Sequence, residues 1–302
     1  MQIYEPSPAD FERGPLVYLA GGLGNQIFML ASGWALAKKH GTPLFVDTSF
    51  YSAKRFRAPE ILLCPTPAIN LGQHSPWQSQ RFPGGRVIPY PRNVLAVQRP
   101  PLFDMSARRT AVSLARSGPN RTLIGYFQSF RFFPGLDADI AAWLRGYVHP
   151  GGERNVTRKL HSGPFVCLHI RRGDLLSGLR RSKYEAPLDY FAEAISRLPA
   201  KAKGLPLVIF TDSRDSVRRE IQAHEVLSDL PFQYFDDTGM SSLEVLVSMS
   251  EAQHFVLSSS TFGFWACWLA HVNEQSEITV FSPAVSRRFW DDVIVGFSPA
   301  FI

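Results

Sequence analysis

Two neighbouring arginines are the clearest chemical feature of the sequence. Arg171 and Arg172 follow the apolar run 165–170, which contains His169, and they lead to Asp174. Arginine holds a pyrophosphate through a planar fork of donors and keeps its charge when partly desolvated. Ligands of an open α/β sheet bind beyond the carboxyl ends of its strands, so this turn predicts a site for an anionic ligand. The alternative is a surface turn in which an arginine pairs with the aspartate.

The stretch 21–26, Gly-Gly-Leu-Gly-Asn-Gln, is a second candidate site. Its glycines let the backbone approach a ligand, and the start of the following helix offers unpaired N–H groups. The third glycine of the dinucleotide fingerprint and the lysine of the P-loop are both missing, which disfavours a nicotinamide enzyme. For Asn25 itself, the alternative role is the N-cap of the helix.

Hydroxyl and carboxylate side chains follow two other apolar runs. The residues Ser258 to Thr261 come between the run 254–257 and an apolar helix, where hydroxyls and helix N–H groups favour a phosphate. Asp212 follows the run 207–211, and its carboxylate can accept hydrogen bonds from a ribose or a base edge. Each could instead only cap the helix that follows it.

The expected elements would place all these stretches at strand ends. Strands are predicted at 15–20, 44–47, 122–127, 165–170, 207–211, 232–235, 254–257 and 278–281, and helices at 25–40, 106–116, 137–147, 187–198, 215–223, 242–252 and 262–272. This alternation is typical of α/β proteins, and after residue 151 it predicts a doubly wound parallel sheet. We expect an N-terminal acceptor-side lobe (1–150) and a C-terminal lobe (151–302), both Rossmann-type, with the ligand in a cleft between them.

Composition narrows the classes of partner. The chain has 302 residues and a net charge of +6, which suits a phosphorylated substrate, nucleic acid or an anionic membrane surface. The basic residues occur in small scattered groups, so no nucleic-acid partner is expected. Three widely spaced cysteines argue against a disulfide framework or a metal site. The acidic start lacks signal-peptide character, and the longest apolar run is too short for a bilayer. These features predict a cytoplasmic protein, with peripheral contact at the inner face of an anionic membrane.

The stretches 22–28 and 169–174 together resemble glycosyltransferase family 11, the α-1,2-fucosyltransferases. Weaker matches at 44–49, 125–129, 210–213 and 258–269 follow in the family's order, so the resemblance covers almost the whole chain. It implies a GT-B-like fold, GDP-fucose as donor, inversion at the anomeric carbon, and neither a metal nor another cofactor.

The resemblance also implies roles for particular residues. Arg171 would hold the donor phosphates and stabilise the leaving GDP, with Arg172 in support. The other donor-binding residues would be His169 and Asp212 by the nucleoside, and Ser259, Ser260 and Thr261 at the phosphates. The sugar and the acceptor would meet Gly22, Gly24, Asn25, Gln26 and Asp47, with Asn25 also catalytic. Asp174 and Asp47 are candidate general bases; Asp174 could instead orient an arginine, and a dissociative step could need no strong base.

The predicted reaction is transfer of L-fucose from GDP-fucose to the 2-hydroxyl of a terminal galactose, on an oligosaccharide or lipid-linked glycan. Three positions depart from the family pattern, namely Leu175, Ser213 and Ser259, and they leave the acceptor and the sugar open. One alternative is another GDP-sugar or another acceptor hydroxyl. The other is a non-catalytic nucleotide- or glycan-binding protein of the same fold.

Overall fold

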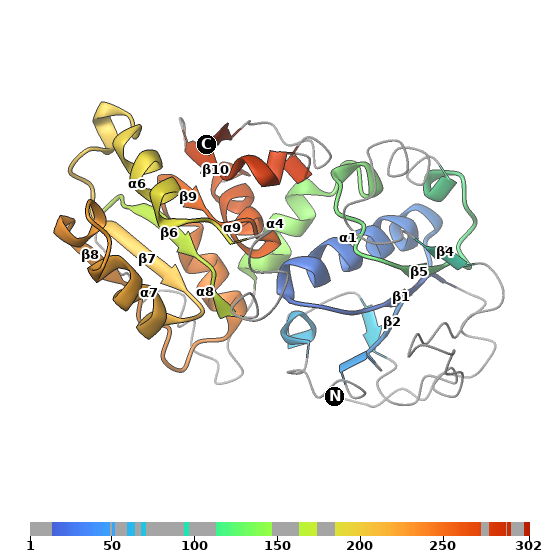
Figure 1. Ribbon diagram of the computed structural model, residues 1–302. Helices are drawn as coiled ribbons and strands as arrows, with labels where there is room; N and C mark the ends of the chain where they lie inside the picture. The colour runs from blue at the N-terminus through green and yellow to red at the C-terminus, as the bar shows by residue number, and fades with distance from the viewer. Residues whose placement is uncertain are drawn as a thin grey trace. The chain divides into compact units, whose positions relative to one another are not determined.

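The computed structural model describes residues 14–48, 50–51, 59–63, 68–70, 94–96, 113–146, 163–173, 185–272, 278–287, 289–290 and 299–302. The chain divides into two compact units. Unit 1 is Met1–Tyr147 with Asp292–Ile294, and unit 2 is Val148–Asp291 with Val295–Ile302. Figure 1 shows unit 1 mainly in blue to green and unit 2 mainly in yellow to red. The boundary predicted at residue 150 falls among residues outside the described ranges, and so does Asp174.

Unit 1 contains a parallel sheet in the order β3-β2-β1-β5-β4. Its strands are β1 (Leu16–Tyr18), β2 (Leu44–Asp47), β3 (Ala68–Asn70), β4 (Val94–Ala96) and β5 (Thr122–Ile124). Its helices are α1 (Leu23–His40) and α4 (Asp137–Arg145), with short 3-10 turns η2 (Glu60–Leu63) and η4 (Phe130–Phe132). Helix α1 ends at Gly41, which adopts the left-handed conformation that glycine tolerates best.

Helix α1 packs unusually closely on the first two strands. A Cβ added at Gly33 would lie 2.4 Å from Cγ2 of Val17 in β1 and 2.7 Å from Cδ1 of Leu44 in β2. Glycine at this position therefore allows the helix to approach the sheet. Because α1 starts at the carboxyl end of β1, this packing also fixes the place of its first turn.

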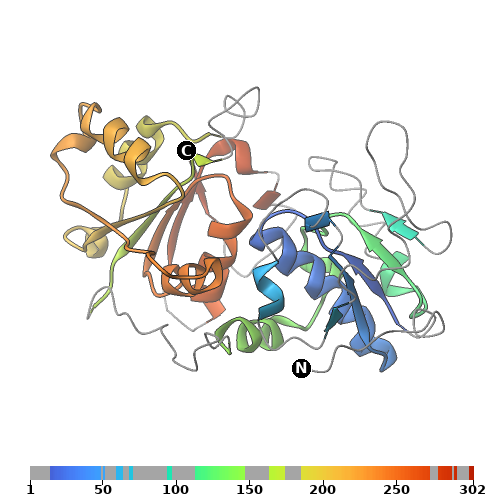
Figure 2. The same cartoon turned by 90° about the horizontal axis from the view of Figure 1, so that it is seen from below.

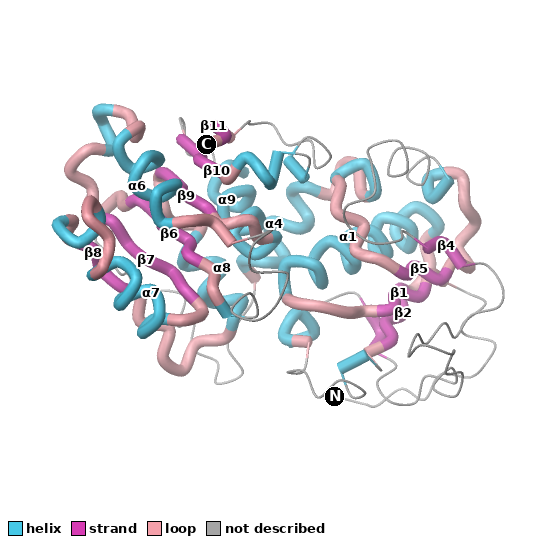
Figure 3. Tube along the Cα trace, viewed as in Figure 1, coloured by secondary structure: helices cyan, strands magenta, loops and turns pink. Residues whose placement is uncertain are grey.

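Unit 2 contains a six-stranded parallel sheet in the order β11-β10-β9-β6-β7-β8, drawn in magenta in Figure 3. Its strands are β6 (Val166–Ile170), β7 (Leu207–Thr211), β8 (Phe232–Tyr234), β9 (His254–Leu257), β10 (Thr279–Ser282) and β11 (Ala300–Phe301). Its helices are α6 (Leu188–Ser196), α7 (Arg214–Gln222), α8 (Ser242–Met249) and α9 (Thr261–Val272), with 3-10 turns η7 (Ala200–Ala202), η8 (Leu227–Asp229) and η9 (Ala284–Ser286). The strand order reverses between β6 and β9, which is the switch point where such sheets bind ligands.

Helices cover both faces of this sheet, as Figure 2 shows. Alternate residues of β6 explain the two layers. Val166, Leu168 and Ile170 pack in the apolar cluster formed with α6 and α7. His169 points to the other face, where its ring meets Gly263 of α9. The α/β class, with a doubly wound parallel sheet in the C-terminal unit, is confirmed.

Most predicted elements occur within a few residues of their expected bounds. The strand expected at 122–127 is shorter, because Gly125 and Phe127 both adopt positive φ angles of 132° and 47° that interrupt it. Of the helix expected at 106–116, the structure describes only the end, which is helical at residues 113–115. Among the described residues, no helix is both long and apolar enough to cross a membrane.

Candidate functional site

Arg171 lies at the carboxyl edge of the unit 2 sheet, beside the switch point. Its backbone N–H donates to Ser258 Oγ at 3.1 Å, which ties the end of β6 to the end of β9. Its guanidinium donates to Ser260 Oγ at 3.4 Å, and Nε lies 4.0 Å from Asp212 Oδ2. About a third of the side chain, 32%, is exposed. The guanidinium is therefore oriented by neighbours on both sides and still reaches solvent.

Asp212 organises the turn that follows β6. Its Oδ1 accepts hydrogen bonds from the backbone N–H groups of Arg172, at 2.8 Å, and Gly173, at 3.0 Å. A Cβ at Gly173 would lie only 2.4 Å from Asp212 Oδ2, so glycine permits this approach. Asp212 does not cap α7, because the N-cap residue is Ser213. The carboxylate instead holds the arginine turn in place.

Arg172 is buried beneath that turn, with 1% of the residue exposed. Its Nε donates to Glu220 at 2.8 Å and lies 3.2 Å from Glu185, and Nη1 donates to the Ala186 carbonyl at 3.1 Å. Sequence reasoning grouped Arg172 with the donor-binding residues. In the structure its guanidinium is held inside unit 2 beneath the turn, and its place among the donor-binding residues stays a prediction.

His169 lies directly behind the same edge and is almost fully buried. Burial lowers its pKa from 6.5 to about 4, and the charge of Arg171 acts in the same direction, while Asp212 opposes both. Its Nδ1 has no hydrogen-bond partner among the described residues, and its ring centroid lies 6.0 Å from that of Phe262. The imidazole is therefore neutral near pH 7.

The hydroxyls between β9 and α9 divide into different roles. Ser258 is buried and accepts from Arg171, as described above. Ser260 accepts from the backbone N–H of Phe262 at 3.2 Å, which is a helix-capping bond. Ser259 and Thr261 are half-buried at the same corner, and Thr261 begins α9. The positive end of the α9 dipole thus lies beside the Arg171 guanidinium.

The glycine-rich stretch forms the corresponding edge of unit 1. Gly22 is the N-cap of α1, so Asn25 lies inside the first turn and does not cap the helix. The Gly21 carbonyl accepts from Gln26 Nε2 at 3.0 Å and from the hydroxyl of Tyr51 at 2.8 Å. Gly24 is buried within the same turn. These bonds fix the backbone that precedes α1.

Asp47 ends β2 at this edge and is 1% exposed. Its carbonyl accepts from the backbone N–H of Leu19, which follows β1. Asp47 and the glycine-rich turn therefore lie at the carboxyl ends of neighbouring strands, as predicted. Asp174, the other candidate base, lies outside the described residues.

Sequence reasoning missed three polar residues at the unit 1 edge. Gln128 Nε2 donates to Asn25 Oδ1 at 2.8 Å, and the Tyr126 hydroxyl would lie 3.3 Å from a Cβ at Gly21. Tyr51 is buried, and burial raises the pKa of its phenol, so the hydroxyl stays protonated and donates to Gly21. The stretch 125–129 entered the sequence argument only as a family match. The position of two of its polar residues just after β5 was the signal that could have identified them.

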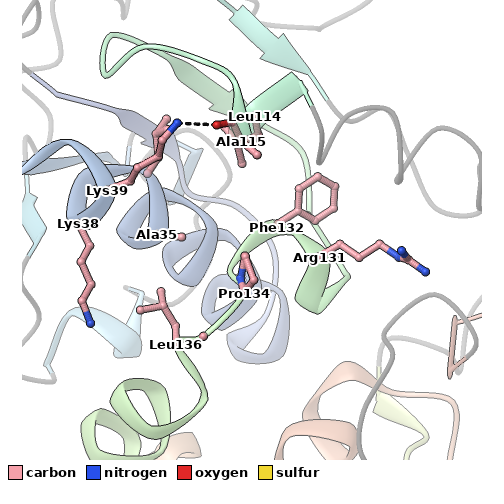
Figure 4. Close-up of a pocket in the computed structure, with 11 residues that line it drawn as sticks. Ala35, Lys38, Lys39, Leu114, Ala115, Arg131, Phe132, Pro134 and Leu136 are labelled. Carbon is pink, nitrogen blue, oxygen red and sulfur yellow. Dashed lines mark hydrogen bonds between the residues drawn. The ribbon is translucent and has the colours of Figure 1, made fainter.

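A separate pocket of about 450 Å³ lies farther along α1 (Figure 4). Leu114, Phe132 and Leu136 line it, together with Lys38 and Lys39. Lys38 pairs with Asp139 at 2.6 Å, and Lys39 donates to the Ala115 carbonyl at 2.5 Å. Lys38 is 13 residues beyond Asn25, or about 20 Å at the helical rise. The pocket is therefore not part of the strand-end site.

Among the residues that the structure describes, no three histidine, cysteine, aspartate or glutamate side chains form a group that could hold a metal ion. The described features that do gather at strand ends are Arg171, Asp212 and the α9 N-terminus in unit 2, and Asn25, Gln26 and Asp47 in unit 1. The first set can stabilise a negative charge. In the second, the half-buried Asn25 amide can bind hydroxyls, while Gln26 and Asp47 are buried.

Known proteins resemble the chain in sequence and fold. The family model described as glycosyl transferase family 11 matches residues 126–288, more than half of the chain. Galactoside α-(1,2)-fucosyltransferase 1 of Saimiri boliviensis boliviensis is 26% identical over 275 residues, covering 87% of this chain and 67% of its own length. The α-1,2-colitosyltransferase of Escherichia coli is 22% identical over 290 residues, covering 89% and 96%. A mutant of Arabidopsis thaliana FUT1 in complex with GDP shares the fold, with a TM-score of 0.50 and 15% identity, over 89% of this chain and 70% of that one.

Proposed function

Because the chain belongs to glycosyltransferase family 11, we propose that it transfers L-fucose from GDP-fucose to the 2-hydroxyl of a terminal galactose in a glycan. The observation that carries the proposal is the partly exposed Arg171 guanidinium beside the N-terminus of α9. The names of the relatives support transfer of a sugar in an α-1,2 linkage. The GDP bound to the plant protein of the same fold supports a guanine nucleotide.

The donor side of the proposed reaction is charge stabilisation on the departing GDP. Arg171 would donate to a phosphate oxygen, and the α9 N–H groups with the hydroxyls of Ser259, Ser260 and Thr261 would hold the other oxygens. Asp212 keeps the turn fixed, so the donors are in place before the bond breaks. We propose that these groups act without a metal ion, since a preorganised set of donors can stabilise the developing charge.

The acceptor side would use the carboxyl edge of unit 1. The half-buried Asn25 amide can bind sugar hydroxyls, whereas Gln26 and Asp47 are 5% and 1% exposed and would support this edge from beneath. Attack from the face opposite GDP would invert the anomeric carbon and give an α linkage from a β-linked donor. The transition state would resemble an oxocarbenium ion.

A second candidate is the same transfer with another GDP-activated deoxysugar. The specific observation that favours it is the colitosyltransferase, because the match covers 96% of that protein. The two candidates share the Arg171 site and differ only in the sugar. Donor competition between GDP-fucose and GDP-colitose, at equal concentrations, would separate them.

The test is acceptor-dependent release of GDP from GDP-fucose, with lactose as acceptor and excess EDTA. We expect release to continue in EDTA and to fall about 10²–10³-fold in Arg171→Ala, because loss of one such donor costs about that factor. Arg197→Ala is the matched control, since Arg197 is an exposed arginine of the same unit. Release that stops in EDTA would contradict the metal-free part of the proposal.

If no GDP is released, the melting temperature measured with increasing GDP would show whether the protein binds the nucleotide. A ligand that binds the folded state raises the melting temperature with its concentration. A GDP-dependent rise without turnover would contradict transfer from GDP-fucose to lactose, and it would support either another sugar or acceptor or a non-catalytic nucleotide-binding protein. No rise with GDP, together with no turnover, would contradict the nucleotide-sugar proposal as a whole.

A further inference from the structure

We propose that Gln128 is a positioning residue that fixes Asn25 as a hydrogen-bond donor toward an oxygen of the bound carbohydrate. The inference rests on the proposed function, because it assumes that the carboxyl edge of unit 1 holds sugar. Gln128 follows β5 and had no predicted role at the site. Its bond to Asn25 determines which atom of the Asn25 amide faces the sugar.

The first step is the bond between the two amides. Asn25 is half-buried in the first turn of α1, and its Oδ1 accepts from Gln128 Nε2 at 2.8 Å. An amide has one acceptor oxygen and one donor nitrogen, so a bond to Oδ1 determines which way Nδ2 points. Asn25 Nδ2 lies toward Gly21, 3.2 Å from where a Cβ would be. The two N–H groups of Nδ2 therefore face the glycine turn.

An uncommon backbone conformation at Phe127 precedes Gln128 and brings it to Asn25. Phe127 is the one described non-glycine residue with positive φ, at 47°. Bulky residues adopt this conformation at a cost, and they keep it where the surrounding structure imposes it, commonly at functional sites. The Phe127 ring is fully buried, with its centroid 5.2 Å from that of Phe132. The chain thus buries Phe127 while Gln128 contacts Asn25.

The side chains of Asn25 and Tyr126 line the space beside Gly21. Gly21 has φ +78°, and a side chain there would meet both Asn25 Nδ2 and Tyr126. Gln26 and Tyr51 already donate to the Gly21 carbonyl. The N–H groups of Asn25 Nδ2 therefore lie beside Gly21, which has no side chain and whose carbonyl already accepts two hydrogen bonds. An acceptor oxygen of a sugar, such as a hydroxyl, ring or glycosidic oxygen, fits that polarity.

The test uses three single variants at Gln128 and Asn25, the double variant Asn25→Asp with Gln128→Met, and one control variant. Gln128→Met removes the bond at nearly constant size. Gln128→Glu leaves only acceptor oxygens at residue 128, so the Asn25 amide would reverse and turn Oδ1 toward the sugar. Asn25→Asp keeps an acceptor for Gln128 and removes the donor. Gln253→Met is the matched control, because Gln253 is a half-buried glutamine of unit 2.

We expect kcat/KM for lactose to fall about tenfold in Gln128→Met, where one hydrogen bond is lost, and roughly a hundredfold in Gln128→Glu, where the reversed Asn25 amide would turn Oδ1 toward the sugar oxygen and leave two acceptors without a donor. Calorimetric affinity for lactose in the presence of GDP should fall in the same order. The melting temperature of Asn25→Asp should stay near that of the wild type. In the Asn25→Asp background, Gln128→Met should have little further effect, because Gln128 would act only through Asn25. Gln253→Met should change neither turnover nor lactose affinity.

Several outcomes would overturn the inference. Lactose turnover or binding within twofold of wild type in both Gln128 variants would do so. An undiminished Gln128→Met effect in the Asn25→Asp background would show a structural role instead. Wild-type protein that binds lactose without turnover would contradict the proposed function, yet ranked lactose affinities in the variants would still support the inference. Wild-type protein that neither binds nor turns over any saccharide would contradict both.

Discussion

At the end of β6 the chain turns two consecutive arginines in different directions. Arg171 reaches the sheet edge, where its side chain is 32% exposed, and Arg172 lies beneath the turn with its side chain 2% exposed. Two carboxylates, Glu185 and Glu220, surround the second guanidinium. We therefore propose that the first arginine binds the ligand and that the second supports the turn.

This division predicts that the same substitution lowers stability at Arg172 and activity at Arg171. Arg172→Met should lower the free energy of unfolding by about 3 kcal/mol, because it leaves two carboxylates without their cation. Arg171→Met should change it by less than about 1 kcal/mol, because a partly exposed ion pair contributes little. Urea denaturation measures both, and GDP release should be lost in Arg171→Met. Equal stability of the two variants would contradict the assignment, with Arg197→Met as the surface control.

The resemblance to the family implied this division, with Arg171 on the phosphates and Arg172 in support, but the local pattern alone could not predict it. Both residues carry the same charge and follow the same strand, so local pattern cannot distinguish them. The partner that buries Arg172 is Glu220, 48 residues away on α7. In the same way, Asn25 was predicted at the sugar side, but its bond to Gln128 spans 103 residues. Long-range contacts of this kind depend on how the elements pack.

At the scale of elements, α9 and β6 form the framework of the donor edge. The helix starts at Thr261 beside Arg171 and crosses the sheet face at Gly263. A Cβ at Gly263 would lie 2.9 Å from His169 Nδ1 and 3.3 Å from Leu257 Cδ2. Close packing at this glycine therefore sets the distance between the helix N-terminus and the arginine turn.

We expect Gly263→Ala to weaken GDP binding and destabilise the protein, although alanine favours helices. Alanine gains about 1 kcal/mol of helix propensity over glycine, while overpacking costs about 1–3 kcal/mol. The added methyl group must displace His169 or move α9 outward, which would carry the N–H groups proposed to bind phosphate away from Arg171. Calorimetric GDP affinity and urea denaturation would measure the two effects.

Gly118→Ala is the matched control, because nothing lies within 4 Å of a Cβ there. We expect it to bind GDP like the wild type. Unchanged GDP affinity and stability in Gly263→Ala would show that α9 tolerates the shift and that its position does not limit the donor site.

Most elements could be predicted because apolar periodicity and capping residues are local. The capping box of Ser241 and Glu244 starts α8, close to the start predicted at residue 242. The end of β5 could not be predicted, because 122–127 reads as one continuous strand pattern. What ends it is the positive φ at Gly125 and Phe127. Burial of the Phe127 ring overrides the local preference, and this bend creates the Gln128 contact.

At the scale of the whole molecule, two buried histidines should make stability depend on pH. Burial lowers the pKa of His169 to about 4, and it also lowers the pKa of His254 in β9, where Lys201 adds to the effect. Both side chains are thus held neutral in the folded chain. In the unfolded chain each would take up a proton near pH 6.5.

Between pH 6.5 and about 4 the unfolded state therefore binds more protons, so stability must fall as the pH falls. His169 alone should contribute about 1.4 kcal/mol per pH unit within this window, and nothing above it. Urea denaturation between pH 7.5 and 5 would measure how steeply the free energy of unfolding falls with pH. Carboxylates titrate mainly below this range, so they contribute little to that slope. His169→Gln should reduce the slope by the equivalent of about one proton taken up on unfolding. The double variant His169→Gln with His254→Gln should reduce it further. If His169→Gln left the slope unchanged, the imidazole would be accessible to protons in the folded chain, and its neutral state behind Arg171 would be wrong.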